Sequence, residues 1–181
     1  MFEFALQAAK DSRLDDLGNV SIISRKIFGE LPTFRFRAKA PCLEYVSLLI
    51  ENELLLRTNR EGRIYACFEK LSRMEYVAER FLRISDLSER VYVFGVPDWK
   101  PPRHPNLRVV KLQPDMKLAC EWIVISHSQK FNAALVAVDE DSFDTPIFDE
   151  RNFRSFKSTD PAIVARLAAA AEDLIDQSAK F

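Results

Sequence analysis

The chain has 181 residues and a formal charge of −1, because 26 Lys and Arg residues are balanced by 27 Asp and Glu residues. This balance argues against a dedicated nucleic-acid-binding protein, which normally carries a strong basic excess. A content of 48% hydrophobic and 29% charged residues is typical of a folded globular domain and excludes a disordered segment. With only 4 glycines, the chain has little room for a glycine-rich phosphate-binding loop.

Cysteine and histidine are scarce. The chain has three cysteines, an odd number without any CxxC spacing, and two histidines. A disulfide framework or a zinc site is therefore not expected, and a reducing compartment is the natural setting. The first residues lack a basic start and carry Glu3 within an apolar stretch, which does not match a secretory signal. No apolar run approaches the length of a bilayer span, so we expect a cytoplasmic protein without membrane attachment or metal.

The first half of the chain alternates between helical and extended patterns. Apolar residues at helical spacing predict a short helix over residues 2–12 and a longer one over about 43–56. Residues 63–68, with the sequence RIYACF, are expected to form a buried strand. A capping-box pattern, Ser72 followed by Glu75, begins a third helix that runs to about residue 84. The segment 31–40 alternates like an edge strand but is bracketed by two prolines, so its structure stays open.

The second half is richer in strands. Strands are expected over residues 91–96, 107–112, 120–126, 132–138 and 153–157. Asp160 followed by Pro161 marks the start of a final helix that ends near residue 177. The connections between residues 91 and 138 are mostly too short for helices, so these strands are expected to be antiparallel. The pattern predicts an α/β domain with an α+β tendency: a single mixed, largely antiparallel sheet of about six strands, flanked by helices.

The candidate for catalysis is Cys120, with Glu121, Trp122 and His127 downstream. In a strand, Cys120 and Trp122 share one face while Glu121 points to the other, which is a poor geometry for a Cys–Glu pair. A cysteine in an apolar strand is usually an inert core residue, and a histidine within Ser-His-Ser-Gln is usually a solvated turn residue. We therefore assign no catalytic residue, although a small enzyme centred on Cys120 and Glu121 remains an alternative.

Glu121 opens an apolar strand, and two interpretations of it stay open. If its carboxylate is buried, it requires a cationic partner, which Arg25 or Lys26 would supply. If the strand lies at a sheet edge, the carboxylate is instead exposed to solvent. In the preferred interpretation Arg25 and Glu121 form a polar pair in a pocket, with Trp122 and Phe68 as its apolar wall.

Two charged segments are interpreted as surface. The segment 139–150 is rich in acidic residues but lacks the glycine and ligand spacing of an EF-hand loop, so a solvated loop is the better interpretation. Arginines and lysines between residues 35 and 63 are interleaved with glutamates, which argues against a phosphate or nucleic-acid site.

An ordered series of short blocks resembles the DICT domain, a sensory module named for its association with diguanylate cyclases and two-component systems. The blocks are VSIISRK (20–26), the helix containing Ile50-Glu51, ACFEK (66–70), VYVFG (91–95), CEWIVIS (120–126), NAALVAVDE (132–140) and the passage from Phe153 into the last helix. They extend over about residues 18–177. Glu69 departs from the family pattern, which tends to carry Gln there.

The resemblance implies a mixed α/β sensory or signal-relay domain from bacteria, including cyanobacteria and actinobacteria, with a proposed role in light-responsive signalling. It implies a domain over residues 18–181, preceded by an N-terminal helical extension over residues 1–17. Candidate ligand- or partner-binding residues are those that fall in the matching blocks: Arg25, Glu51, Phe68, Glu69, Glu121 and Trp122. The family pattern specifies no ligand, and the cofactor is unknown.

The function expected from this resemblance is non-catalytic. A sensory module without an output domain acts by changing what it binds, so a signalling partner such as a kinase, a cyclase or a regulator is expected. The alternative is an adaptor without a small ligand, in which the 14 phenylalanines and the last helix form a docking or homodimer surface.

Overall fold

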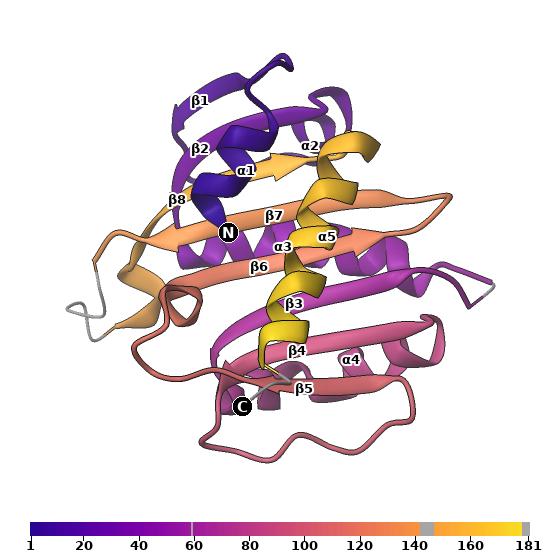
Figure 1. The fold of residues 1–181 in the computed structure, drawn as a ribbon. Coiled ribbons are helices and arrows are strands. Elements are labelled where there is room, and N and C mark those ends of the chain that lie inside the picture. Colours follow the sequence, from indigo (N-terminus) through magenta and orange to yellow (C-terminus); the bar gives the residue numbers. More distant parts are fainter. Residues whose placement is uncertain (59, 142–146, 179–181) are drawn as a thin grey trace.

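The computed structural model describes residues 1–58, 60–141 and 147–178, the side chains of residues 177 and 178 excepted. These residues form one mixed sheet with helices on both faces (Figure 1). The helices are α1 (Phe2–Ala8), α2 (Arg25–Glu30), α3 (Ala40–Leu55), α4 (Ala78–Asp86) and α5 (Pro161–Ser178). The strands are β1 (Asp15–Asn19), β2 (Thr33–Lys39), β3 (Arg63–Lys70), β4 (Arg90–Val96), β5 (Leu107–Lys111), β6 (Glu121–His127), β7 (Asn132–Asp139) and β8 (Asn152–Ser158). Three 3-10 turns complete it: η1 (Leu71–Val77), η2 (Lys117–Cys120) and η3 (Phe148–Glu150).

The strand order is β1-β2-β8-β7-β6-β3-β4-β5. The pairs β1–β2, β3–β4 and β4–β5 are parallel, and the four pairs between β2 and β3 are antiparallel. The predicted α/β class and mixed sheet are therefore confirmed. Within the described part of the chain the sheet has eight strands, two more than the sequence indicated.

The two additional strands lie together at one end of the sheet. In β2, Phe34, Phe36 and Ala38 alternate with exposed residues and are buried, so the ambiguous segment is a strand despite the prolines. It pairs on both sides and is not an edge strand. The edge strand β1 has the sequence DDLGN, whose Asp, Gly and Asn disfavour strands, and none of its residues is fully buried. Its pairing with β2 therefore comes from tertiary context.

The antiparallel arrangement expected between residues 91 and 138 is wrong for β4 and β5, which are parallel. Residues 97–106 connect them as an irregular crossover without a helix. Ten extended residues reach roughly 33 Å, which is enough to return along a strand of seven residues. The four prolines in this segment favour such an extended path.

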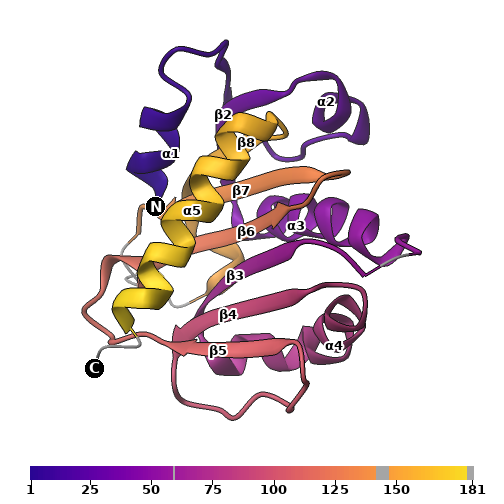
Figure 2. The same cartoon turned by 45° about the vertical axis from the view of Figure 1, so that its right-hand side comes forward.

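Two helical layers cover the sheet, as the turned view shows (Figure 2). On one face α1 and α5 pack over a core that includes Phe156, Leu167 and Ile125. On the other face α3 and α4 cover two further clusters, one around Phe34 and Val46 and one around Phe81. Because Phe2 and Ala5 of α1 belong to the same core as α5, the helix packs closely on the sheet; the domain boundary at residue 17 stays a prediction.

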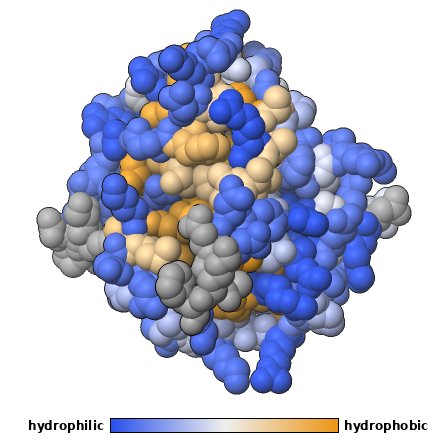
Figure 3. Space-filling model, in the orientation of Figure 1, coloured by the Kyte–Doolittle hydropathy of each residue, from blue (hydrophilic) through white to orange (hydrophobic). Residues whose placement is uncertain are grey.

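The outer surface of the α1–α5 layer is partly apolar. In the space-filling view, apolar side chains gather over these two helices and are surrounded by hydrophilic ones (Figure 3). The sequence of α5 explains much of this, because it carries a run of alanines, and Phe4 of α1 is 39% exposed. Small apolar side chains of this kind are common on protein surfaces.

One irregularity in the sheet positions the site. The ladder between β3 and β6 ends at the pair Cys67–Ile123, whereas β6 continues to pair with β7 as far as Glu121–Val138. Beyond Cys67, β3 shifts its register against β4 and rejoins it at Lys70–Val96. The last residues of β3 thus leave β6, and the sheet divides there between its parallel and antiparallel parts. We call this place the seam.

Candidate functional site

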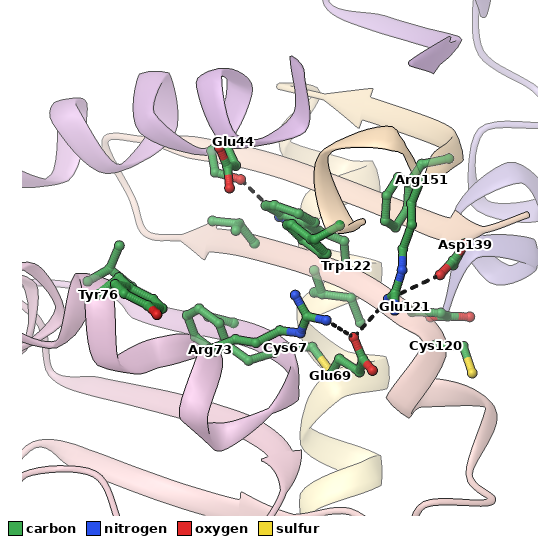
Figure 4. A pocket seen from close by; sticks show the side chains of 18 of the residues that line it. Glu44, Cys67, Glu69, Arg73, Tyr76, Cys120, Glu121, Trp122, Asp139 and Arg151 are labelled. Carbon is green, nitrogen blue, oxygen red and sulfur yellow. Dashed lines mark hydrogen bonds and ion pairs between the residues drawn. The ribbon is translucent and has the colours of Figure 1, made fainter. Parts of the chain in front are cut away.

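A pocket of about 530 Å³ lies at the seam, on the face covered by α3 and α4. Figure 4 shows α3 on one side, η1 on the other and the ends of β3, β6 and β7 between them. The carboxyl end of β3 and the start of β6 form the floor, and η3 and the start of β8 close one end. A volume of this size is within the range of small-molecule sites, roughly 300–1,000 Å³.

The wall of the pocket is aromatic. Trp122 faces α3 and donates a hydrogen bond from Nε1 to Ser47 Oγ at 3.0 Å; this is the dashed line near Glu44 in Figure 4. The Trp122 ring stacks on Phe148 with ring centroids 5.9 Å apart and meets Phe153 edge-on at the same distance. Phe68, on the other side of the seam, packs edge-on against Phe81 of α4. Two separate aromatic groups therefore hold the wall rigid.

A charged cluster crosses the open end of the seam. Glu69 Oε2 lies 2.8 Å from Arg73 Nη2 and 3.0 Å from Arg151 Nη1, so two guanidinium groups from different elements converge on one oxygen. Arg151 also lies 3.6 Å from Asp139 Oδ2. The cluster ties β3, η1, β7 and the start of β8 together, and Figure 4 shows the two arginines reaching Glu69 from opposite sides. Partly buried ion pairs of this kind depend on their geometry, because desolvation offsets much of the attraction.

Glu51 lies deeper, on α3, and is 5% exposed. Burial raises the pKa of its carboxyl, although the adjacent Arg80 guanidinium opposes this by pairing with the charged form. Arg80 also donates a hydrogen bond to Asn52 at 2.6 Å. The pair joins α3 to α4 behind the aromatic wall.

The structure brings together five of the six predicted site residues. Glu51, Phe68, Glu69, Glu121 and Trp122 all line the pocket. Glu121 contributes differently from the others, because it alternates with Trp122 along β6 and its carboxylate meets the opposite layer. It accepts hydrogen bonds from the Met1 amino group at 3.0 Å and from the Phe2 backbone N–H at 3.3 Å.

Arg25 does not line the pocket. It is an exposed residue at the start of α2, a helix that packs near the β1–β2 end of the sheet. The expected Arg25–Glu121 pair is not formed, and Lys26 pairs instead with Glu30 of its own helix. Both residues lie close to a buried strand in the sequence, but α2 turns their side chains to solvent.

The thiol of Cys120 lies beside the charged cluster of Glu69, Arg151 and Asp139. Burial raises the pKa of Cys120, and the neighbouring carboxylates of Asp139, Glu69 and Glu121 raise it further. Cys67, buried on the adjacent strand, also has a raised pKa because of its burial. His127 is bonded through Nδ1 to Asn132 at 2.8 Å, at the far end of β6. The surroundings of Cys120 therefore favour the neutral thiol, which is a poor nucleophile.

The sequence did not point to several of the pocket residues. They are Glu44, Ser47, Arg73, Asp139, Phe148 and Arg151. Arg73 and Arg151 are 78 positions apart, and only the sheet order brings them to one carboxylate. A weak signal is present in the sequence: Asp139 and Arg151 bound the acidic segment, at the end of one predicted strand and just before the next.

Other charged segments are largely paired at the surface. Arg35 pairs with Asp16, Arg37 with Glu140, and Arg63 with Glu172. Among the described residues no group of three or more His, Cys, Asp or Glu is placed to hold a metal ion. Residues 142–146 of the acidic segment lie outside the described residues. Nor does the described chain include a helix long and apolar enough to cross a membrane.

A family model described as "Sensory domain in DIguanylate Cyclases and Two-component system", DICT, matches residues 39–140. These residues run from the end of β2 through α3 and β3 to β7, and they include most of the pocket. The chain belongs to the DICT family. The DICT domain is a sensory domain of signalling proteins, which fits a pocket built at a sheet seam.

No curated protein matches this DICT chain. Among solved structures, it is similar to the polyphosphate kinase of Porphyromonas gingivalis, with 22% identity and a TM-score of 0.45. The similarity covers 80% of this chain and 23% of that one. At this level it supports no statement about activity.

Proposed function

We propose that this DICT chain is a non-catalytic sensory module that binds a small ligand at the seam and relays its occupancy to a signalling protein. The pocket of about 530 Å³ carries the proposal, because it brings five candidate residues from distant parts of the sequence to one place. Its wall is aromatic and its open end is charged, which is the common composition of small-molecule sites.

The protonation of Cys120 and the ion pairs of Glu69 and Glu51 support a non-catalytic role. The Cys120 thiol is held neutral by burial and by nearby carboxylates. Glu69 and Glu51 are each engaged by arginine, so neither is a free general base.

The relay has a physical route. α3 and η1 both line the pocket and both carry exposed apolar residues, Leu48 at 39% and Tyr76 at 94%. A ligand that moves η1 against α3 changes the surface that these residues present to a partner. Signalling then requires that the partner binds the occupied and empty forms with different affinity.

The setting that we propose is bacterial signalling with a kinase, cyclase or regulator as partner, in a light-responsive pathway of cyanobacterial type. Arg25, exposed on α2, is in this view a partner-contact residue rather than a pocket residue. A homodimer or an adaptor without ligand is the alternative, and the exposed Tyr76 favours it because aromatic side chains are enriched at protein contacts.

Native mass spectrometry of the protein purified from its own host tests the proposal. A non-covalent mass excess that disappears on denaturation is expected. Phe148→Ala, which removes one member of the aromatic wall, should lower that occupancy, whereas Phe4→Ala on the opposite layer should not. If the protein carries no excess mass and binds a partner equally well after Phe148→Ala, the adaptor alternative replaces the sensor.

A further inference from the structure

The charges that line the pocket are unequal. Four carboxylates, from Glu44, Glu51, Glu69 and Asp139, and the side chains of two arginines, Arg73 and Arg151, line the pocket among the described residues. The carboxylate of Glu121, which also contributes to the lining, points instead to the opposite layer. Arg80 offsets Glu51 from behind the wall, and the Met1 amino group offsets Glu121. The lining therefore keeps an excess of negative charge, which favours a positively charged guest over an anion.

Glu44 is where this excess is least compensated. Its carboxylate lies on the first half of α3, at the pocket mouth, and has no ion pair or hydrogen bond within the described part of the chain. Glu44 is exposed to solvent, and partial desolvation, together with the nearby charge of Asp149, raises its pKa. A cation beside the Glu44 carboxylate would therefore gain a favourable electrostatic interaction at the mouth.

Asp139 provides a second, independent observation: one of its carboxylate oxygens lacks a hydrogen-bond donor among the described residues. Its side chain is 3% exposed and lines the pocket. One carboxylate oxygen accepts the Asp141 N–H at 2.8 Å, but Oδ2 has no hydrogen bond among the described residues and lies 3.6 Å from Arg151. A buried acceptor without a donor is costly, so a guest with N–H groups is favoured.

The aromatic wall already accommodates a cation. The Arg73 guanidinium lies over the Phe148 ring, with its carbon 4.1 Å from the ring centroid. Phe148 stacks in turn on Trp122, the ring type that attracts cations most strongly. The aromatic wall can therefore pack against the apolar part of a ligand and also contact a positively charged group.

We propose that the pocket selects organic amines: a protonated amino group at the mouth beside Glu44, and an aromatic or aliphatic body along Trp122 and Phe148. This inference rests on the proposed function, since it names the ligand class of the same site. The ammonium supplies the positive charge that the mouth lacks, and the body fills the apolar part of the cavity.

Three probes of similar shape test the charge: 2-phenylethylamine, 2-phenylethanol and 3-phenylpropionate, titrated by isothermal calorimetry. The amine is expected to bind at least about fivefold more tightly than the alcohol, and the carboxylate more weakly than both. Added salt should weaken only the binding of the amine toward that of the alcohol, because the mouth is open to solvent. Equal affinity for amine and alcohol, or tightest binding of the carboxylate, would overturn amine selection.

Glu44→Gln keeps the shape of the side chain and removes its charge. It should weaken the amine about two- to fivefold, as for a solvent-accessible ion pair, and leave the alcohol unchanged. Glu53→Gln on the same helix is the matched control, because Glu53 is exposed and does not line the pocket; it should change neither. An unchanged amine affinity in Glu44→Gln would contradict the proposed position of the ammonium.

The two proposals fail differently. If native mass spectrometry shows a bound molecule that is not an amine, and the amine probe does not displace it, the ligand class is wrong while the sensory pocket stands. If the protein is bare and no probe binds, both proposals fall.

Discussion

Lys157 is fully buried although it carries a charge. It lies on β8 beneath α2, where its ammonium donates hydrogen bonds to the carbonyl oxygens of Phe28 at 2.6 Å and Leu31 at 2.8 Å. The rings of Phe28 and Phe34 flank it, at 4.4 and 5.2 Å. Burial alone lowers the pKa of Lys157 to about 8. The two hydrogen bonds of the Lys157 side chain therefore hold the end of a short helix that has no buried residue of its own.

The lowered pKa of Lys157 predicts how the stability of the fold depends on pH. Between about pH 8 and the ordinary lysine value near 10.4, the unfolded chain binds a proton that the folded chain has released. The free energy of unfolding should therefore rise with pH across that window, by about 3 kcal/mol in all for this one group. Below pH 8 both states are protonated and the contribution is constant.

Urea denaturation at several pH values measures how the free energy of unfolding depends on pH, with Lys157→Met as the reference. The variant has no group to titrate there, so the difference in free energy of unfolding, wild type minus variant, should increase from about pH 8 to about pH 10. Subtraction cancels the titration of the other lysines and tyrosines. A difference independent of pH would mean that Lys157 has an ordinary pKa in the folded state.

At the residue scale, the direction in which a side chain points is easier to predict from the sequence than the group that it contacts. Alternation along a strand predicts that Trp122 faces the opposite way from Glu121, and the structure agrees. The partner of Glu121 could not be predicted from the sequence, because its carboxylate contacts Met1 and Phe2. Met1 lies 120 positions before Glu121 in the chain. Contacts of this range depend on strand order, which local patterns do not encode.

At the scale of elements, the seam depends on a close approach between β4 and the end of β3. A Cβ at Gly95 would lie 2.8 Å from the Phe68 carbonyl oxygen and 3.1 Å from the Leu71 backbone nitrogen. Both contacts are backbone atoms, which cannot move aside. Glycine at this position of β4 therefore allows β3 to shift its register and leave β6.

Gly95→Ala should consequently lower the free energy of unfolding by at least about 2 kcal/mol, as overpacking of a rigid site does. It should also weaken ligand binding, because Phe68 and Glu69 are displaced. Chemical denaturation and calorimetry measure the two effects.

Gly29→Ala provides the matched control for that substitution. Gly29 lies in α2, and nothing lies within 4 Å of the place that a Cβ would take there. The change should therefore stabilise the protein by up to about 1 kcal/mol through helix propensity. Ligand affinity should stay constant. If Gly95→Ala behaves like Gly29→Ala, the close approach is not what holds the seam in place.

Most helices and strands are predictable because their periodicity is strong. The helix containing Val46 and Ile50, and the six adjacent strands from β8 to the β5 edge of the sheet, follow from hydrophobic spacing. α2 and β1 are not, because neither contains a fully buried residue that would leave a pattern. The parallel pairing of β4 and β5 escapes prediction because a proline-rich segment performs the crossover that a helix usually makes.

At the scale of the whole molecule, the two layers are fastened to the sheet by different contacts. On the α5 face, the Tyr65 hydroxyl donates to Glu172 Oε1 at 2.5 Å, and Arg63 pairs with the same carboxylate at 2.8 Å. Burial, together with this carboxylate, raises the pKa of Tyr65 well above its usual range. The pocket lies on the other face, against α3 and α4.

Tyr65→Phe should therefore separate stability from ligand binding. Loss of the hydroxyl removes a hydrogen bond to a charged group, which contributes about 1–3 kcal/mol. The free energy of unfolding, measured by chemical denaturation, should fall by that amount, while the affinity of the pocket stays constant.

Tyr92→Phe is the comparison for Tyr65→Phe. Tyr92 stacks on Tyr65, but its hydroxyl has no hydrogen bond within the described part of the chain, so little change is expected. A loss of pocket affinity in Tyr65→Phe would show instead that the two faces are coupled through β3.

The strand order also sets the speed at which the chain folds. β2 pairs with β8, so that Thr33 lies opposite Ser158. Among the described strands, β8 alone joins the β1–β2 unit to the rest of the sheet. Because β2 and β8 are far apart in the sequence, bringing them together costs conformational entropy before their contacts stabilise the sheet. We therefore expect the sheet from β3 to β7 to assemble first and the β1–β2 end to dock late, after β8 has left the ribosome. During synthesis, the backbone edge of β2 that pairs with β8 stays unpaired until β8 has been made, which leaves this strand open to aggregation and to chaperones.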